Sequence, residues 1–340
     1  MKIRFDQLPE KEKSLILQDL FNKTTIPAHA IEKDWWVVQT LSLIFELDVA
    51  KHLVFKGGTS LSKAWKIIDR FSEDIDLAID REFLGFKGDL TKKQRTELRK
   101  KAGNYTSDIF YNELKAKFAE KGFSNVQLKL VETTESDQDP RIIEVYYPYV
   151  ADYTAYIAPK VQVEIGCRSL REPFSIQEFG SLIDENYPNQ PFTSASIKVP
   201  TVNPERTFLE KIFLLHEEFQ RPEEKIRVNR LSRHLYDVVK LSKTQFAEKA
   251  LQNKELYTTI IEHRSKFTRV GGVDYKLHHP KHINPIPTEK YIDAWRKDYK
   301  SMLDQMIHEE NAPSFDEIIE ELKILKSKIN SLGWRFDKEF

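Results

Sequence analysis

The spacing of hydrophobic and polar residues predicts alternating helices and strands over the first 200 residues. Apolar positions at helical spacing favour helices, and short runs of apolar and β-branched residues favour strands. We expect helices at 8–22, 29–47, 59–68 and 91–121, the last with a break near Gly103, and strands at 52–55, 75–79, 126–131, 141–149 and 161–165.

The rest of the chain has a different pattern. A strand is expected near 196–199, ending at Pro200. Asn203-Pro204-Glu205 then combines a capping residue, a proline at the first helical position and an acid in the first turn, which is typical of a helix start. We expect helices at 204–220, 230–241, 245–264, 288–308 and 314–332, with a long loop at 269–287. This order predicts an α+β (mixed α/β) fold, with an N-terminal domain at 1–200 and a helical C-terminal domain at 201–340.

Composition excludes several protein classes. The 340 residues include 53 basic and 53 acidic ones, so no overall positive field attracts nucleic acid, and any such binding must come from local basic patches. A single cysteine, Cys167, excludes an internal disulfide framework and cysteine-rich zinc modules. Neither an apolar signal core nor a run long enough to span a bilayer is present. We therefore expect a cytoplasmic protein without a membrane partner.

Two adjacent glycines stand between a predicted strand and a predicted helix. Gly57 and Gly58 are two of only 11 glycines in the chain. Such a pair lets backbone N–H groups approach an anion at the positive end of a helix, and Thr59 and Ser60 add hydroxyl donors. A tight strand–helix turn without a ligand is the simpler interpretation, because short glycine motifs are weak signals.

Asp74 and Asp76 form the strongest chemical signal. Residues two apart in a strand share a face, so the two carboxylates point the same way while Ile75 and Leu77 pack the other face. Paired carboxylates repel each other unless a cation lies between them, and oxygen ligands suit Mg²⁺ or Mn²⁺. The alternative is a pair of solvated acids on an edge strand. The apolar opposite face favours a core strand instead, where unpaired acids would be costly.

A third acid is a candidate member of the same site. In the strand at 161–165, Glu164 lies on the polar face. If this strand neighbours the one that carries Asp74 and Asp76, Glu164 could complete a two-metal site. A solvent-facing glutamate on a half-exposed strand fits the pattern equally well.

These motifs together resemble a known enzyme family. A strand, a Gly-Gly-Thr-Ser turn, a helix, an Asp-x-Asp strand and a later acid resemble the minimal nucleotidyltransferase fold of the DNA polymerase β superfamily. More narrowly, residues 55–61 and 70–77 are similar to motifs of the AbiEii/AbiGii toxin family, which includes the MenT toxins. The segment Glu-Lys-Asp-Trp-Trp at 32–36 looks like the opening segment of that group. We assign no role from this family to the insertion at 82–122 or to the helices beyond 245.

Two further residues follow from this resemblance. Lys211 and Asp237 are similar to the family's third and fourth motifs, although the fourth motif usually has a lysine directly before an aspartate, which is absent here. Lys211 lies at the margin of an apolar helix stripe, where it could reach a cleft or merely cover apolar neighbours. Asp237 follows Arg233 by four residues, so a helix salt bridge is its simpler explanation.

The resemblance implies a Mg²⁺- or Mn²⁺-dependent nucleotidyltransferase that uses an NTP. Asp74 and Asp76 would hold the metals, Lys211 would neutralise the triphosphate, and Asp237 or Glu164 would activate the acceptor hydroxyl. Gly57, Gly58, Thr59 and Ser60 would hold the phosphates. The implied acceptor is a tRNA 3′ end, and the implied role is that of a toxin in a toxin–antitoxin or phage-defence system with a cognate antitoxin. Nucleotidylation of a protein, including self-modification at Ser60, and an inactive fold used as a binding module are the alternatives.

Overall fold

The computed structural model describes residues 3–153, 157–309 and 311–336. The chain divides into two compact units with an interleaved order. The first, here called the sheet unit, consists of Met1–Ala64 and Phe71–Val202. The second, the helical unit, consists of Trp65–Arg70 and Asn203–Phe340. The domain boundary at residue 200 stays a prediction. That prediction places residues 65–70 in the first domain, whereas they belong to the helical unit.

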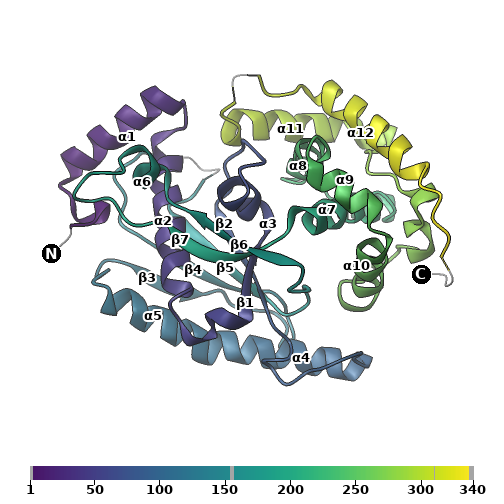
Figure 1. Cartoon of the computed structure of the whole chain (residues 1–340), viewed down its shortest axis with the longest axis horizontal. Coiled ribbons are helices and arrows are strands. Elements are labelled where there is room, and N and C mark those ends of the chain that lie inside the picture. The colour runs from purple at the N-terminus through teal and green to yellow at the C-terminus, as the bar shows by residue number, and fades with distance from the viewer. Residues whose placement is uncertain (1–2, 154–156, 310, 337–340) are drawn as a thin grey trace. The chain divides into compact units, whose positions relative to one another are not determined.

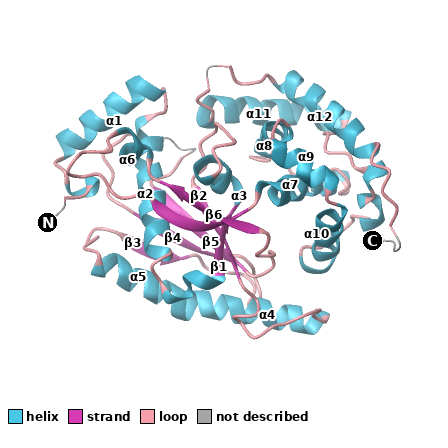
Figure 2. Cartoon of the chain, viewed as in Figure 1, coloured by secondary structure: helices cyan, strands magenta, loops and turns pink. Residues whose placement is uncertain are grey.

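The sheet unit is built on a mixed sheet that, over the described residues, has seven strands in the order β3-β4-β5-β2-β1-β7-β6 (Figure 2). β2 pairs with β5 in parallel and with β1 in antiparallel orientation, and β1 pairs with β7 in parallel. The strand that carries the Asp-x-Asp motif is therefore the central one. The strands are β1 (Leu53–Lys56), β2 (Asp74–Ile79), β3 (Gln127–Leu130), β4 (Arg141–Tyr146), β5 (Lys160–Gly166), β6 (Phe174–Phe179) and β7 (Ile197–Val202).

Helices pack around this sheet (Figure 1). α2 is buried on nearly all sides and packs against β2, β5 and α5. The break predicted near Gly103 is a π-helical segment, Tyr105–Phe110, which joins two α-helices without interrupting the helical path. The helices of this unit are α1 (Glu10–Thr24), α2 (Ala28–Ile44), α3 (Gly57–Thr59) with the π-helical turn Ser60–Ala64, α4 (Lys92–Asn104), α5 (Tyr111–Glu120) and α6 (Leu182–Asn186).

The helical unit is centred on α7, which packs against α8, α9 and α10. Pro204 occupies the first turn of α7 and Asn203 precedes it, so the predicted helix start is confirmed. The segment predicted as a long loop contains only short 3₁₀ turns. The helices are α7 (Pro204–Glu218), α8 (Arg233–Ser242), α9 (Gln245–Gln252), α10 (Lys254–Phe267), α11 (Ile292–Met306) and α12 (Phe315–Asn330).

Several predicted elements differ from the structure in their bounds, and three of them show the local reason. The helix expected at 59–68 ends at Ala64, and Lys66 adopts a positive φ of 52° that no helix continues through. The helix expected at 245–264 is two helices, because the Asn253 side chain accepts a hydrogen bond from Leu256 N at 2.9 Å and caps the second one. The strand expected to end at Pro200 continues to Val202, since residues on both sides of the proline pair with β6.

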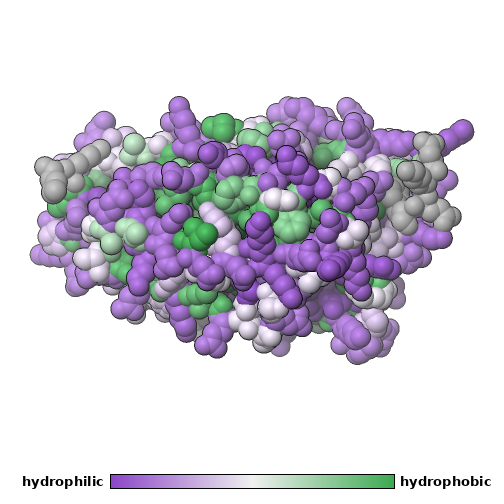
Figure 3. Space-filling view, turned by 90° about the horizontal axis from the view of Figure 1, so that it is seen from below, coloured by the Kyte–Doolittle hydropathy of each residue, from purple (hydrophilic) through white to green (hydrophobic). Residues whose placement is uncertain are grey.

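Figure 3 shows one face of the molecule, which is covered mainly by hydrophilic residues with small hydrophobic patches between them. The exposed large apolar side chains include Leu15, Ile176 and Ile324, each on a different element. In residues 3–153, 157–309 and 311–336, no helix is both long and apolar enough to cross a membrane.

Candidate active site

The two acids of the Asp-x-Asp motif lie on one face of β2. Asp74 and Asp76 are partly exposed, while Ile75 and Leu77 between and beside them are completely buried. This alternation is the predicted one. The edge-strand alternative is wrong, because β2 has a hydrogen-bonded neighbour on each side. The carboxylates therefore project from the middle of a rigid sheet.

Gly57 brings the glycine turn into direct contact with Asp76. Lys56 at the end of β1 is the register partner of Asp76, and Gly57 follows with a φ of +79°. A Cβ atom at position 57 would lie 1.9 Å from Asp76 Oδ2 and 3.0 Å from Asp76 Cβ. Only glycine fits here, both for the backbone conformation and for the space. The turn and the acid thus form one packed unit.

The hydroxyl groups of the turn hold the turn itself together. Thr59 Oγ1 donates to the backbone oxygen of Asp74 at 2.5 Å, and Ser60 Oγ donates to the backbone oxygen of Gly57 at 2.9 Å. Both residues are almost completely buried. Thr59 therefore ties the turn to the start of β2, and burial disfavours Ser60 as an acceptor of a nucleotidyl group.

Glu164 is the register partner of Asp76 across the β2–β5 pair. The condition that the sequence left open, namely that the two strands are neighbours, is therefore met. Within the described residues, however, no group of three or more His, Cys, Asp or Glu side chains is arranged to hold a metal ion. A metal role for Glu164 stays a prediction.

Lys211 and Asp237 form a buried ion pair in the helical unit. Lys211 Nζ lies 2.9 Å from Asp237 Oδ2, and the Asp237 side chain is completely buried. Arg70 donates to the same carboxylate through Nε at 2.7 Å and Nη2 at 2.8 Å. Lys211 is therefore a buried ion-pair partner and not a lysine that lies over exposed apolar surface. The ion-pair partners of Asp237 come from α7 and from the segment before β2, and not from the preceding turn of its own helix.

His234 is the fourth member of this cluster. Its Nδ1 lies 3.2 Å from Lys211 Nζ. Burial, followed by the charge of Lys211, holds the pKa of His234 well below its usual range, so Nδ1 can accept a hydrogen bond. Burial also lowers the pKa of Lys211, which the Asp237 charge opposes. Burial alone would raise the pKa of Asp237, but Arg70 and Lys211 outweigh it and keep the carboxylate ionised.

The structure thus brings the predicted residues together in two sets. Gly57, Asp74, Asp76 and Glu164 meet in the sheet unit, and Lys211 meets Asp237 in the helical unit. Sequence reasoning missed that Arg70 and His234 belong to the second set. Arg70 stands 167 positions before Asp237, and no local pattern links them.

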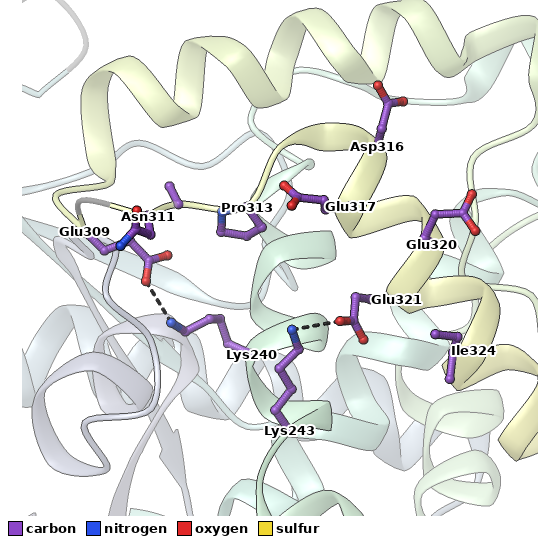
Figure 4. A pocket seen from close by; sticks show the side chains of 11 residues that line it. Lys240, Lys243, Glu309, Asn311, Pro313, Asp316, Glu317, Glu320, Glu321 and Ile324 are labelled. Atoms are coloured by element: carbon purple, nitrogen blue, oxygen red, sulfur yellow. Dashed lines mark hydrogen bonds and ion pairs between the residues drawn. The ribbon is translucent and has the colours of Figure 1, made fainter.

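A separate pocket of about 840 Å³ lies in the helical unit (Figure 4). Glu309, Glu317 and Glu320 are among its lining residues, and ion pairs join Lys240 to Glu309 and Lys243 to Glu321. Because ion pairs within the chain involve both of its lysines and several of its acids, and because none of the residues predicted from the sequence lines it, we assign it no ligand.

A mixed sheet with paired carboxylates beside a glycine turn fits a nucleotidyltransferase. A family model described as "Nucleotidyl transferase AbiEii toxin, Type IV TA system" matches residues 42–321. The chain therefore belongs to the AbiEii nucleotidyltransferase toxin family, and the inactive binding module is not the favoured interpretation.

Other comparisons add less. A search of curated proteins finds no match. Two solved structures from Helicobacter pylori are similar to this chain, each at 14% identity. One is JHP933, with a TM-score of 0.40, over 86% of this chain and 89% of that one. The other is described as a "putative nucleotidyltransferase", with a TM-score of 0.41, over 86% of this chain and 92% of that one.

Proposed function

We propose that this protein transfers a nucleoside monophosphate from an NTP to the 3′ end of a tRNA, and that this reaction arrests growth. The observation that carries the transfer chemistry is the contact between the Gly57 turn and the Asp76 carboxylate on the central strand. This contact sets backbone N–H groups, which suit phosphate oxygens, beside an oxygen ligand that suits a divalent cation. The tRNA acceptor rests on the resemblance of the 55–61 and 70–77 motifs.

The residues present fit Mg²⁺ or Mn²⁺. Asp74 and Asp76 offer carboxylate oxygens on one face of β2, and both are partly exposed. Mg²⁺ is commonly held by one or two carboxylates together with substrate phosphates, so a complete protein cage is not needed. When bound, the ion would offset negative charge on the transferred phosphate.

The chain's own groups then have separate tasks. The backbone at Gly57 and Gly58 holds the triphosphate, and Thr59 and Ser60 keep the turn in shape through the hydroxyl contacts described above. For Lys211, the resemblance of its motif implies that its charge supports the phosphates, and we keep this role as part of the proposal.

In the transfer, the acceptor hydroxyl oxygen forms a bond to the α-phosphorus, and the bond from that phosphorus to the bridging oxygen of pyrophosphate breaks. The hydroxyl proton must pass to a base. Asp237 is the weaker candidate, because two cations hold its pKa low and occupy its oxygens. We favour Glu164, the register partner of Asp76, as the base that accepts this proton.

The test is to incubate the purified protein with each α-labelled NTP, Mg²⁺, and either total tRNA or a protein extract. Label should enter tRNA, and Asp76→Asn should remove the signal at an unchanged melting temperature. Label in protein alone would replace tRNA as the acceptor. Absence of label from every acceptor with every NTP would overturn the transfer reaction.

The biological part is tested by expression. The wild-type chain should arrest growth of a bacterial host, and the Asp76→Asn variant should not. Because the family belongs to a toxin–antitoxin system, a cognate antitoxin should restore growth, and the system's effect on phage infection can be measured with the same strains. Equal arrest by both variants would show that transfer is not the cause of toxicity.

A further inference from the structure

Three consecutive charged residues are buried in the middle of the sheet unit. Glu32, Lys33 and Asp34 on α2 have exposed fractions of 1%, 2% and 4%. Buried charges are costly unless they are paired, so each needs a partner. Successive residues of an α-helix point about 100° apart, and these three therefore reach three different segments of the chain.

Lys33 holds the residue that precedes the Asp-x-Asp motif. Its ammonium donates to Glu73 Oε2 at 2.6 Å and to the backbone oxygen of Ala158 at 3.0 Å. The exposed fractions of the Lys33 and Glu73 side chains are only 3% and 8%. Because Glu73 is bonded directly to Asp74, this ion pair fixes the start of β2 against α2.

Asp34 contacts the turn that follows the Gly-Gly pair. Its Oδ1 lies 2.8 Å from Lys63 Nζ, and its Oδ2 accepts from Lys63 Nζ at 3.0 Å and from Leu182 N at 2.6 Å. Lys63 lies in the π-helical turn that continues directly from Gly57–Thr59. The second ion pair thus fixes the far end of the glycine turn to the same helix.

Glu32 provides an internal comparison. Its carboxylate accepts hydrogen bonds from Val150 N at 2.9 Å and Ala151 N at 3.2 Å. These two residues belong to the segment after β4, which carries none of the candidate site residues. Glu32 is therefore as buried as its two neighbours but anchors a different part of the fold.

We propose that Lys33 and Asp34 are positioning residues of the nucleotidyltransferase site. Through Glu73 and Lys63, one turn of α2 sets the spacing between the glycine turn and the Asp-x-Asp strand. Neither residue touches the reacting atoms in this proposal. The proposal rests on the proposed function for its kinetic part, but its structural part concerns local opening of two short segments and can be measured without any substrate.

The experiment uses the full-length chain and a pair of substitutions that leaves no buried charge unmatched. Lys33→Met combined with Glu73→Gln removes both charges of one ion pair, whereas a single substitution leaves the partner uncompensated. Asp34→Asn weakens the second pair. Glu32→Gln is the matched control. Each variant is measured by amide hydrogen exchange, by thermal melting, and by kcat and KM for the NTP.

The Lys33→Met/Glu73→Gln variant should exchange amides at 72–76 at least tenfold faster than wild type, and its kcat should fall at least tenfold. Asp34→Asn should show faster exchange at 60–64 and a raised KM for the NTP, because the phosphate-binding turn loosens. Glu32→Gln should change exchange near 150–151 only, and keep kcat and KM within about twofold.

Two results would overturn the proposal. One is unchanged exchange at 72–76 and at 60–64. The other is an equal loss of protection and of kcat in the Glu32→Gln control, which would mean that all three residues merely stabilise the fold. If the wild-type protein transfers no nucleotide, the proposed function fails, and the exchange pattern alone decides whether these ion pairs position the two segments.

Discussion

Substitution of Gly57 by alanine tests the contact on which the site depends. Two separate costs are expected. A positive φ costs an L-residue roughly 1–2 kcal/mol. In addition, the new methyl group would lie 1.9 Å from Asp76 Oδ2, 2.7 Å from Cγ and 3.0 Å from Cβ. Rotation of the Asp76 side chain about its Cα–Cβ bond can relieve the first two contacts, but the strand fixes Cβ. Overpacking of this kind costs about 1–3 kcal/mol.

Gly88 is a matched control for the backbone cost. It also has a positive φ, +65°, yet a Cβ there would meet no atom within 4 Å. Gly88→Ala should therefore cost only the roughly 1–2 kcal/mol of backbone strain. The difference between the two variants, about 1–3 kcal/mol, corresponds to about 2–12 °C in melting temperature for a unit of this size.

A double substitution identifies the cause of the loss. Asp76→Ala removes the carboxylate that the new methyl group would strike, so the cost of Gly57→Ala should be smaller in the Asp76→Ala background by at least about 1 kcal/mol in a double-mutant cycle. Melting is followed by scanning fluorimetry, and nucleotide transfer is measured on the same samples. Gly57→Ala should abolish transfer, whereas Gly88→Ala should keep it.

Additive melting shifts in the cycle would refute the contact between Gly57 and Asp76. Full transfer activity in Gly57→Ala would refute its role in the site, because the Asp76 carboxylate cannot keep its position beside an added methyl group.

Four further predictions concern charges. Asp74→Asn, like Asp76→Asn, should abolish transfer and leave the melting temperature within a few degrees of wild type; activity near wild type in both would remove the metal assignment. Lys211→Met should lose most transfer but only about 1–2 kcal/mol of stability, because Arg70 still pairs with Asp237, and Lys211→Arg should recover only part of the transfer. Asp237→Asn leaves two buried cations without a counter-charge and should cost about 3–5 kcal/mol; a smaller loss than that of Lys211→Met would contradict the geometry. The Asp237 pKa is lowered in the folded protein, so the ionised carboxylate stabilises the fold above the ordinary carboxyl pKa, and this stability is lost as the pH falls through the lowered pKa. Acid unfolding, monitored by circular dichroism, should therefore start at lower pH in wild type than in Asp237→Asn.

Local sequence patterns were sufficient to predict the central strand and the face on which its two acids lie. The alternation of Asp74 and Asp76 with Ile75 and Leu77 is a property of neighbouring residues, and a strand conveys it directly to the two faces of the sheet. The position of Glu164 could be expected only conditionally. Parallel pairing of β2 with β5 joins segments more than 80 residues apart, and periodicity does not encode which strands become neighbours.

The cluster around Asp237 shows a second limit. Arg233 lies four residues before Asp237, and the local rule for helix neighbours suggests that residue as its partner. The actual partners, Arg70 and Lys211, come from other elements and are placed by tertiary packing. β6 was missed for a different reason. Only Phe179 of its six residues is buried, so it lacks the burial alternation of a strand with one buried face.

The interleaved order of the two units limits how this protein can be divided. Trp65–Arg70 belongs to the helical unit but is inserted between Ala64 and Phe71 of the sheet unit, so the backbone passes from one unit to the other three times. Cleavage between Val202 and Asn203 would leave that hexapeptide attached to the sheet unit, with the Trp65 ring separated from Phe246 and Arg70 from Asp237. Replacement of the helical unit by fusion at residue 202 would therefore leave Trp65–Arg70 behind, and an amino-terminal fragment that ends there would lack the Phe246 ring beside Trp65 and the Asp237 counter-charge of Arg70.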